Sequence, residues 1–340
     1  MRRIATLILV LAASTASAQD RWSSPHAGVS VLERRAPGPR EVRAVFVDLC
    51  TPQLRVRATR PSERGLTTSA FAERAGALAA INGDFFDRGF APVGLAIGEG
   101  ERWPDAQLRE DWSLFAAGPG RAGVLYDPRA PWPSEAVGGV PQIVVDGVAV
   151  APYESLFCRR EHPRSALGID REGRTLIFAV VDGRSASSVG ATCAELAALM
   201  AELGAWQAIN LDGGGSSALF VEGRGLINRP SDGSERPVAN HLAIVRSESS
   251  GVDACPSAGW RAPSRARPSS AALPSDPGAL SPVSSTAESR SARRFHEGLS
   301  AEREREQRVE APSERGPRPW VTLTAACAVL VLGAAVWRTR

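Results

Sequence analysis

Apolar and polar residues divide the chain into a long, regularly patterned middle stretch and two ends of different character. Within the middle stretch, short apolar runs at residues 42–48, 54–58 and 175–181 have the length and composition of β-strands. They alternate with two longer patterns that have helical spacing. We therefore expect a single globular domain that combines short strands with a few helices.

The clearer helix is predicted to begin at Thr192, where Thr192 and Glu195 form a capping-box pattern. Apolar residues then recur at helical spacing as far as Leu203, and Gly204 supplies a stop signal. An alanine-rich helix is predicted over residues 69–78. Each helix leads directly into a further apolar run. This succession predicts an α+β fold of α/β type, with a mixed β-sheet and flanking helices.

The N-terminal end predicts export. Arg2 and Arg3 precede an apolar run at residues 4–13 and a small-residue triplet at residues 16–18. This order is typical of a secretory signal peptide that is cleaved before Gln19. We expect the leader to be absent from the mature protein.

The C-terminal end predicts membrane attachment. Residues 320–337 contain no charged side chain and are long enough to cross a bilayer as a helix, at about 1.5 Å per residue. Arginines in residues 338–340 favour a cytoplasmic tail, which would place the domain on the extracytoplasmic side. Residues 251–319 are rich in Pro, Ser, Ala and Arg without periodicity, as in a disordered stalk. The predicted order is thus a signal peptide (1–18), a domain (19–250), a stalk, one transmembrane helix and a tail.

The composition excludes some kinds of chemistry and of partner. All 40 basic residues are arginine, so a Schiff-base lysine and a P-loop lysine are both excluded. The formal net charge is only +3, which gives no reason to expect nucleic acid as a partner.

Four of the five cysteines lie in the predicted exported part, where disulfides persist. Four cysteines allow three pairings. We expect Cys158 to pair with Cys193, because these two bracket a compact, motif-rich segment. Cys50 would then pair with Cys255 and join the two ends of the domain. No closely spaced cysteine pair indicates a zinc site.

An Asn-x-Asp sequence follows each predicted helix and its apolar run. Asn82 and Asp84 end the first run, and Asn210 and Asp212 end the second. Residues two apart share one face of a strand, and ligands commonly bind at the carboxyl ends of strands in open α/β folds. The alternative is that each Asn and Asp only begins a turn.

The second of these sequences continues into a glycine-rich turn. Gly213, Gly214 and Ser216 follow Asp212, and such a backbone can approach a ligand closely and present its amide groups. Together the polar groups exceed what turns require. Three further polar loops accompany them, at residues 163–168, 182–184 and 228–240.

This series of motifs resembles the phosphodiester glycosidase family, which includes the enzyme that uncovers mannose 6-phosphate by removing N-acetylglucosamine from a phosphodiester. The resemblance covers most of residues 44–245, and its most specific part is the Asn-Leu-Asp-Gly-Gly-Gly-Ser-Ser sequence of residues 210–217. We see no growth-factor-like module of the kind that the animal enzyme carries, so that enzyme's own substrate is not carried over. The other matching stretches are residues 82–86, 164–168, 182–184, 190–196 and 232–240.

The resemblance implies a hydrolase that cleaves a glycosyl-1-phosphodiester. Because the leaving phosphate is already a stable anion, groups that hold it matter more than a strong general acid. Arg164, Arg184 and Arg236 are the expected phosphate ligands, since a guanidinium binds phosphate in a bidentate fork. The expected partners are this glycan substrate and the membrane that holds the C-terminal helix.

Within the resemblance, Asp212 is the first candidate for the catalytic base or nucleophile, followed by Asp84 and Asp182. Asn82 and Asn210 are expected to bind sugar hydroxyls. No cofactor is expected, although the three carboxylates are oxygen ligands of the kind that Ca²⁺ or Mg²⁺ accepts.

Two other functions are compatible with the sequence. Ser216 and His241 with an aspartate would make a serine hydrolase, but residues 214–218 lack the final glycine of a nucleophile elbow. The other alternative is a non-catalytic cell-surface domain that binds a glycan without turnover. His162 and His241 have no spaced partner that would indicate a metal site, so we expect them to be structural.

Overall fold

The computed structural model describes residues 19–261 except 37, 39, 110–111, 151–154 and 247–250. The predicted signal peptide, most of the predicted stalk and the predicted transmembrane helix lie outside the described residues. Among the described residues, no helix has the length and apolar character needed to cross a bilayer.

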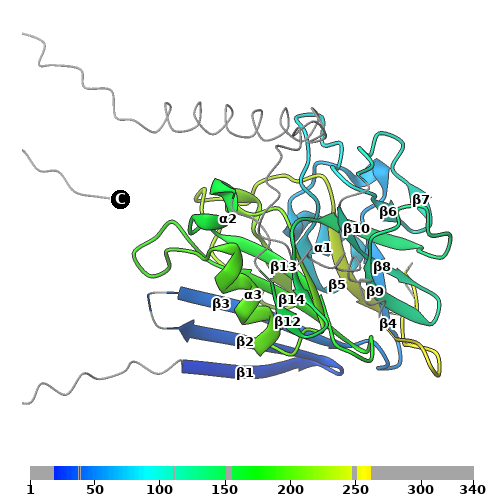
Figure 1. The fold of residues 1–340 in the computed structure, drawn as a ribbon, viewed down its shortest axis with the longest axis horizontal. Helices are drawn as coiled ribbons and strands as arrows, with labels where there is room; N and C mark the ends of the chain where they lie inside the picture. The colour runs from blue at the N-terminus through cyan, green and yellow to red at the C-terminus, as the bar shows by residue number, and fades with distance from the viewer. Residues whose placement is uncertain are drawn as a thin grey trace, which may run out of the picture. The chain divides into compact units, whose positions relative to one another are not determined.

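The described strands form three sheets, and every strand pair within them is antiparallel (Figure 1). The first sheet has eight strands, in the order β1 (Gln19–His26), β2 (Val29–Ala36), β3 (Arg40–Asp48), β14 (Thr175–Val181), β13 (Arg164–Ile169), β15 (Gln207–Asn210), β11 (Gln142–Val145) and β12 (Val148–Ala149). The second has five, in the order β17 (Gly225–Leu226), β16 (Leu219–Val221), β5 (Ala77–Asn82), β18 (His241–Arg246) and β4 (Leu54–Ala58). The third also has five, in the order β7 (Glu101–Arg102), β6 (Ile97–Gly98), β10 (Glu135–Gly139), β8 (Ser113–Gly118) and β9 (Arg121–Leu125). The predicted strands at 54–58 and 175–181 coincide with β4 and β14.

Among the described residues, the helices are α1 (Thr68–Ala75), α2 (Leu156–Arg159) and α3 (Cys193–Glu202), with short 3-10 turns at Pro61–Glu63 and Gly214–Ser216. The predicted capping box of α3 is confirmed, since the Glu195 N–H donates to Thr192 Oγ1 and the Glu195 carboxylate accepts the Thr192 N–H. Gly76, in the left-handed region at φ 63°, ends α1. The helix therefore stops before the predicted end at residue 78, and β5 begins at Ala77.

One arrangement of helix and strands occurs twice. β4 leads through α1 into β5, and β14 leads through α3 into β15. In each case an antiparallel strand, β18 or β13, lies between the two strands that the helix connects. The succession of helix and strand predicts a mixed sheet, and that prediction is wrong because the inserted strand pairs antiparallel with both neighbours. The flanking helices are as predicted.

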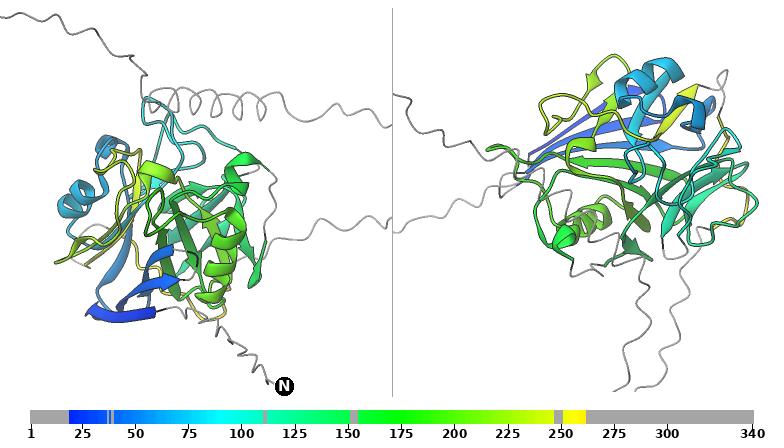
Figure 2. Two further views of the ribbon diagram at one scale, coloured as in Figure 1. Left: turned by 90° about the vertical axis from the view of Figure 1, so that its left-hand side faces the viewer. Right: turned by 90° about the horizontal axis from the view of Figure 1, so that it is seen from above.

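A large apolar core lies between the sheets. In β14, Leu176, Phe178 and Val180 face this core, whereas Ile177 and Ala179 face α3. A smaller apolar cluster joins α1 to the outer face of the second sheet. Figure 2 shows α1 and α3 on opposite sides of the packed sheets. Strands β5 and β15 are thereby held in two layers of the same domain.

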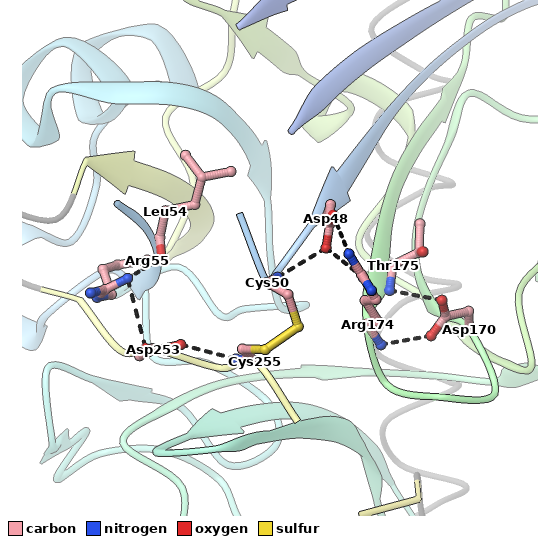
Figure 3. The surroundings of a disulfide bond; sticks show 9 residues. All are labelled: Asp48, Cys50, Leu54, Arg55, Asp170, Arg174, Thr175, Asp253 and Cys255. Atoms are coloured by element: carbon pink, nitrogen blue, oxygen red, sulfur yellow. Dashed lines mark hydrogen bonds and ion pairs between the residues drawn. A yellow bond between two sulfur atoms is a disulfide. The ribbon is translucent and has the colours of Figure 1, made fainter. Parts of the chain in front are cut away.

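Both predicted disulfides are confirmed. Cys158 is bonded to Cys193, which joins α2 to the start of α3 with Cα atoms 4.8 Å apart. Cys50 is bonded to Cys255, with Cα atoms 4.6 Å apart. Figure 3 shows that Asp48 lies beside this second bond, where its Oδ1 accepts the Cys50 N–H at 3.0 Å. The second disulfide therefore attaches the end of the described chain to the turn after β3.

The globular part extends past the predicted boundary at Ser250. Val252 pairs with Val56 of β4, and the indole nitrogen of Trp260 donates to the carbonyl of Ala122 at 3.1 Å. These contacts, together with the second disulfide, make residues 251–261 part of the domain.

Glu135 joins the third sheet to the second. Its Oε2 accepts the N–H of Ala58 in β4 at 2.6 Å, and its Oε1 accepts the N–H of Glu99 at 3.1 Å. Burial of the carboxyl raises the pKa of Glu135 from its ordinary value of 4.5 to about 8, although both hydrogen bonds act in the opposite direction.

We predict that Glu135→Gln makes the melting temperature less dependent on pH. Because the folded-state pKa is raised, protonated Glu135 stabilises the fold fully below its ordinary pKa of 4.5, and this contribution is lost as the pH rises to about 8. A glutamine keeps an acceptor for the two N–H groups and does not titrate. Thermal unfolding from about pH 5 to about pH 9 should therefore show a shallower decline in the variant. Parallel curves for the wild type, Glu135→Gln and the exposed control Glu172→Gln would contradict this prediction.

Candidate active site

Strands β5 and β15 end beside each other and bring the two Asn-x-Asp sequences together. The Asp212 N–H donates to the carbonyl of Gly83 at 3.1 Å, and Asn82 Nδ2 donates to the carbonyl of Asp212 at 2.8 Å. Both bonds connect segments that leave different sheets. They hold Asp84, the next residue after Gly83, close enough to Asp212 for the two charges to interact.

Asp84 is a buried carboxyl with two fixed donors. Its Oδ1 accepts the Gly138 N–H at 2.8 Å, and its Oδ2 accepts a hydrogen bond from Asn240 Nδ2 at 2.7 Å. Burial raises the pKa of Asp84 well above its ordinary value of 3.8, and the nearby charge of Asp212 also raises it, while the two donors oppose the rise. Asp84 is therefore suited to hold and transfer a proton.

Asp212 has a different environment from Asp84. Its side chain is half-buried, and its Oδ1 accepts the N–H of Gly213 at 2.9 Å. The 3-10 turn Gly214–Ser216 follows immediately. The two neighbouring carboxyls thus differ in exposure and in hydrogen bonding, which is how a protein gives two acids different roles in one reaction.

The two asparagines hold the backbone around the carboxyls. Asn82 Oδ1 accepts hydrogen bonds from Ser165 Oγ at 2.7 Å and from the Ala218 N–H at 3.2 Å. Asn210 Nδ2 donates to two backbone carbonyls, at 2.8 and 2.9 Å. Asn210 Oδ1 is buried without a hydrogen-bond partner among the described residues. The predicted contacts of both residues with sugar hydroxyls stay predictions.

Two of the three predicted phosphate-binding arginines meet at the glycine-rich turn. Arg236 bonds to Asp232 Oδ2 through Nη2 at 2.5 Å and Nε at 3.1 Å, and Arg184 Nη1 lies 3.5 Å from Asp232 Oδ1. Two guanidinium groups on one carboxylate leave an excess of positive charge, and both remain partly exposed. A Cβ atom at Gly215 would lie 1.9 Å from Asp232 Oδ2, and one at Gly214 would lie 3.2 Å from Arg184 Nη2. The cluster therefore rests directly on the turn, and a side chain at Gly214 or Gly215 would have to displace it.

Arg164 has a different setting. It is completely buried, and it donates from Nε to the carbonyl of Ala191 at 2.8 Å and from Nη2 to the carbonyls of Phe157 and Arg160 at 2.6 and 3.0 Å. Its guanidinium carbon also lies 4.4 Å from the centre of the Phe157 ring. These contacts join α2 to the start of β13 and favour a structural role over the predicted phosphate contact.

Asp182 lies outside the Asp84–Asp212 pair and binds the loop that begins at Asn228. Its Oδ1 accepts the Arg229 N–H at 2.9 Å and faces Asn228 Nδ2 at 3.4 Å. Burial raises the pKa of Asp182. Asn228 also donates to a carbonyl just after the glycine-rich turn, at 3.0 Å. Across the described residues, no three His, Cys, Asp or Glu side chains are grouped to hold a metal ion, so a cation shared by Asp84, Asp182 and Asp212 is not supported.

The residues of a serine hydrolase are not assembled. Ser216 Oγ is buried and has no hydrogen-bond partner in the described part of the chain, so no base is in place to activate it. His241 instead lies 3.0 Å from Thr59 Oγ1 through Nδ1 and stacks on Phe71, with ring centroids 4.6 Å apart. Burial lowers the pKa of His241 to about 3. As predicted, this histidine has a structural setting.

Sequence reasoning missed several residues around Asp84. Asn240 lies in a matching stretch, but its bond to a residue 156 positions away carries no local signal. Gly138 has no sequence signal of its own. Its role follows from the structure, where a Cβ atom at this position would lie 2.5 Å from Asp84 Oδ1. The ring of Phe85, the residue after Asp84, packs against Trp112 and Phe157, with centroids 5.7 and 5.8 Å apart.

Comparison with known sequences supports the family. A family model described as phosphodiester glycosidase matches residues 75–245. The SPbeta prophage-derived uncharacterized protein YomE of Bacillus subtilis (strain 168) is 46% identical over 84 residues, which make up 25% of this chain and 13% of that protein. The chain therefore spans a small part of this curated relative.

Comparison with solved structures supports the fold. A hypothetical protein from Synechocystis superposes with a TM-score of 0.52 at 18% identity, over 68% of this chain and 65% of that one. The catalytic domain of zebrafish N-acetylglucosamine-1-phosphodiester alpha-N-acetylglucosaminidase, auto-inhibited by its pro-peptide, gives a TM-score of 0.50 at 20% identity, over 68% and 89% of the two chains. At these identities the likeness concerns the fold alone. The family match, which covers about half of the 340 residues and includes both Asn-x-Asp sequences, shows that the chain belongs to the phosphodiester glycosidase family.

Proposed function

We propose that the protein is a glycosidase that hydrolyses a sugar-1-phosphodiester bond in a glycan or a cell-envelope polymer. The observation that carries this proposal is that Asp84 and Asp212 lie close together beside the glycine-rich turn. Arg184 and Arg236 reach this turn from other loops. The carboxyls are suited to act at the anomeric carbon, and the arginines are suited to hold the departing phosphate.

In this reaction the bond between the sugar C1 and the bridging oxygen breaks, and water supplies the new hydroxyl on the sugar. Asp212 is the proposed base or nucleophile because it is half-buried and begins the glycine-rich turn. Asp84, buried and inclined to keep its proton, is the proposed partner in proton transfer. The leaving group is a phosphomonoester anion, whose charge Arg184 and Arg236 would stabilise.

We predict that Asp212→Asn lowers the turnover of a glycosyl phosphodiester by about three orders of magnitude or more, because a catalytic carboxylate is lost. The measurement is the initial rate of the purified protein. Asp170→Asn is a matched control, since Asp170 shapes a turn by accepting the N–H groups of Arg174 and Thr175 at 2.7 and 2.9 Å. An Asp212→Asn protein that melts earlier but retains a near-normal rate would show that Asp212 is only structural.

We predict that Arg184→Ala lowers kcat/KM for a glycosyl phosphodiester about 100-fold and that for a neutral aryl glycoside of the same sugar much less, because only the first leaving group carries phosphate. Arg174→Ala is the control, since this exposed arginine pairs with Asp48 away from the turn. Equal losses on the two substrates would contradict a phosphate contact of Arg184.

We further propose that the protein is exported and held to a membrane by residues 320–337. The leader-like residues 1–18, the apolar C-terminal run and the two disulfides support this proposal. We predict that a reporter enzyme that is active only outside the cytoplasm stays inactive when it is fused after Arg340. A reporter that became active in this position would reverse the proposed orientation.

A further inference from the structure

Asn240 lies immediately before β18 and reaches across the end of β5. Its carbonyl accepts the Gly83 N–H at 2.9 Å, one residue beyond the pairing of His241 with Asn82. A Cβ atom at Gly83 would lie 2.3 Å from Asn240 Oδ1. The absence of a side chain at Gly83 thus lets the buried amide of Asn240 pass over the backbone and meet Asp84.

The contacts of Asn240 fix the orientation of its amide. The Asp84 N–H, which can only donate, bonds to Asn240 Oδ1 at 2.8 Å. Nδ2 therefore faces Asp84 Oδ2, and it too can only donate, at 2.7 Å. The Gly138 N–H donates to the other carboxyl oxygen. Both oxygens of Asp84 must act as acceptors in these two directions, so a proton on this carboxyl has to point elsewhere.

The same contacts oppose the effect of burial. Burial and the charge of Asp212 favour the protonated form of Asp84, whereas the donors on Asn240 and Gly138 and a backbone hydrogen bond within Asp84 itself favour the ionised form. Asn240 makes the largest contribution among the donors. Without the Asn240 donor, the Asp84 carboxyl would hold its proton more strongly, and it would rotate more freely.

We propose that Asn240 is a positioning residue of the glycosidase: it orients the carboxyl of Asp84 and keeps its proton transferable. This role rests on the proposed function, in which Asp84 exchanges a proton during cleavage of a glycosyl phosphodiester. This positioning role differs from a merely structural one. The Asn240 amide has to change the pH at which Asp84 titrates, in addition to stabilising the fold.

Asn240→Asp tests this role with a minimal change. The substitution keeps an acceptor for the Asp84 N–H, removes the donor that faces Asp84 Oδ2 and places a carboxyl oxygen there instead. Losing a donor and gaining a neighbouring carboxylate both favour the protonated form, so the apparent midpoint of Asp84 should move up by about one pH unit or more. The titration is followed by carboxyl ¹³C NMR on the substrate-free protein, with the Asp84 signal assigned by its loss in Asp84→Asn.

Asn228→Asp is the matched control for the titration. Asn228 is also buried and faces a buried carboxylate, Asp182 Oδ1, at 3.4 Å. This change should leave the midpoint of Asp84 in place. An unchanged Asp84 midpoint in Asn240→Asp would overturn the proposal. Because no substrate is present, that result is distinct from a failure of the wild type to cleave any glycosyl phosphodiester, which would overturn the proposed function instead.

The exchange variant Asp84→Asn with Asn240→Asp tests the geometry even where the single variant folds poorly. The amide at position 84 would then donate to a carboxylate at position 240, while the Gly138 N–H and the backbone N–H of position 84 keep their acceptors. We expect the melting temperature to recover most of the loss seen in Asn240→Asp, and the rate to remain about 1,000-fold or more below the wild type. No recovery of stability would contradict the amide orientation, and recovery of activity would contradict the assignment of Asp84 as the carboxyl that Asn240 positions.

Discussion

The site depends on the hydrogen bonds that join the end of β5 to the end of β15. The Asp212 N–H reaches the carbonyl of Gly83, and the amide of Asn82 reaches the carbonyl of Asp212. One carboxyl of the pair follows a strand of the second sheet and the other follows a strand of the first. Neither sheet alone contains the site, so the apolar core that packs the sheets together also sets the separation of the two acids.

The third sheet completes the electrostatics of this junction. Gly138 in β10 donates to Asp84, and its lack of a side chain lets the carboxyl approach the strand. The carboxyl of Asp84 is thus buried, and its hydrogen-bond donors come from segments that are distant in sequence. Asp212 is half-buried next to the glycine-rich turn. Burial of Asp84 raises its pKa, and the charge of the adjacent Asp212 acts in the same direction. Arg184 and Arg236, which are partly exposed and reach the same turn from other loops, add positive charge there.

The sequence predicts those features of the fold and site that have local signals. The capping box at Thr192, the strands β4 and β14 and the Asn-Leu-Asp-Gly-Gly-Gly run can be read from adjacent residues, and they agree with the structure. The mixed sheet was wrong because β18, which separates β4 from β5, comes from the far end of the domain. The setting of Arg164 was missed for a similar reason, since its partners are backbone carbonyls that only tertiary packing brings together. Asn240 and Gly138 were missed for the same reason, because their importance lies in contacts with Asp84 that only the tertiary fold creates.

The central claim is that the protein cleaves the sugar side of a glycosyl phosphodiester. Hydrolysis in H₂¹⁸O, followed by ³¹P NMR and mass spectrometry of both products, tests this claim most directly. A glycosidase breaks the bond between C1 and the bridging oxygen, so the account predicts ¹⁸O in the released sugar and none in the phosphomonoester. Incorporation of ¹⁸O into the phosphate would mean that the P–O bond is broken, and it would contradict the assignment of Asp84 and Asp212 to chemistry at the sugar carbon.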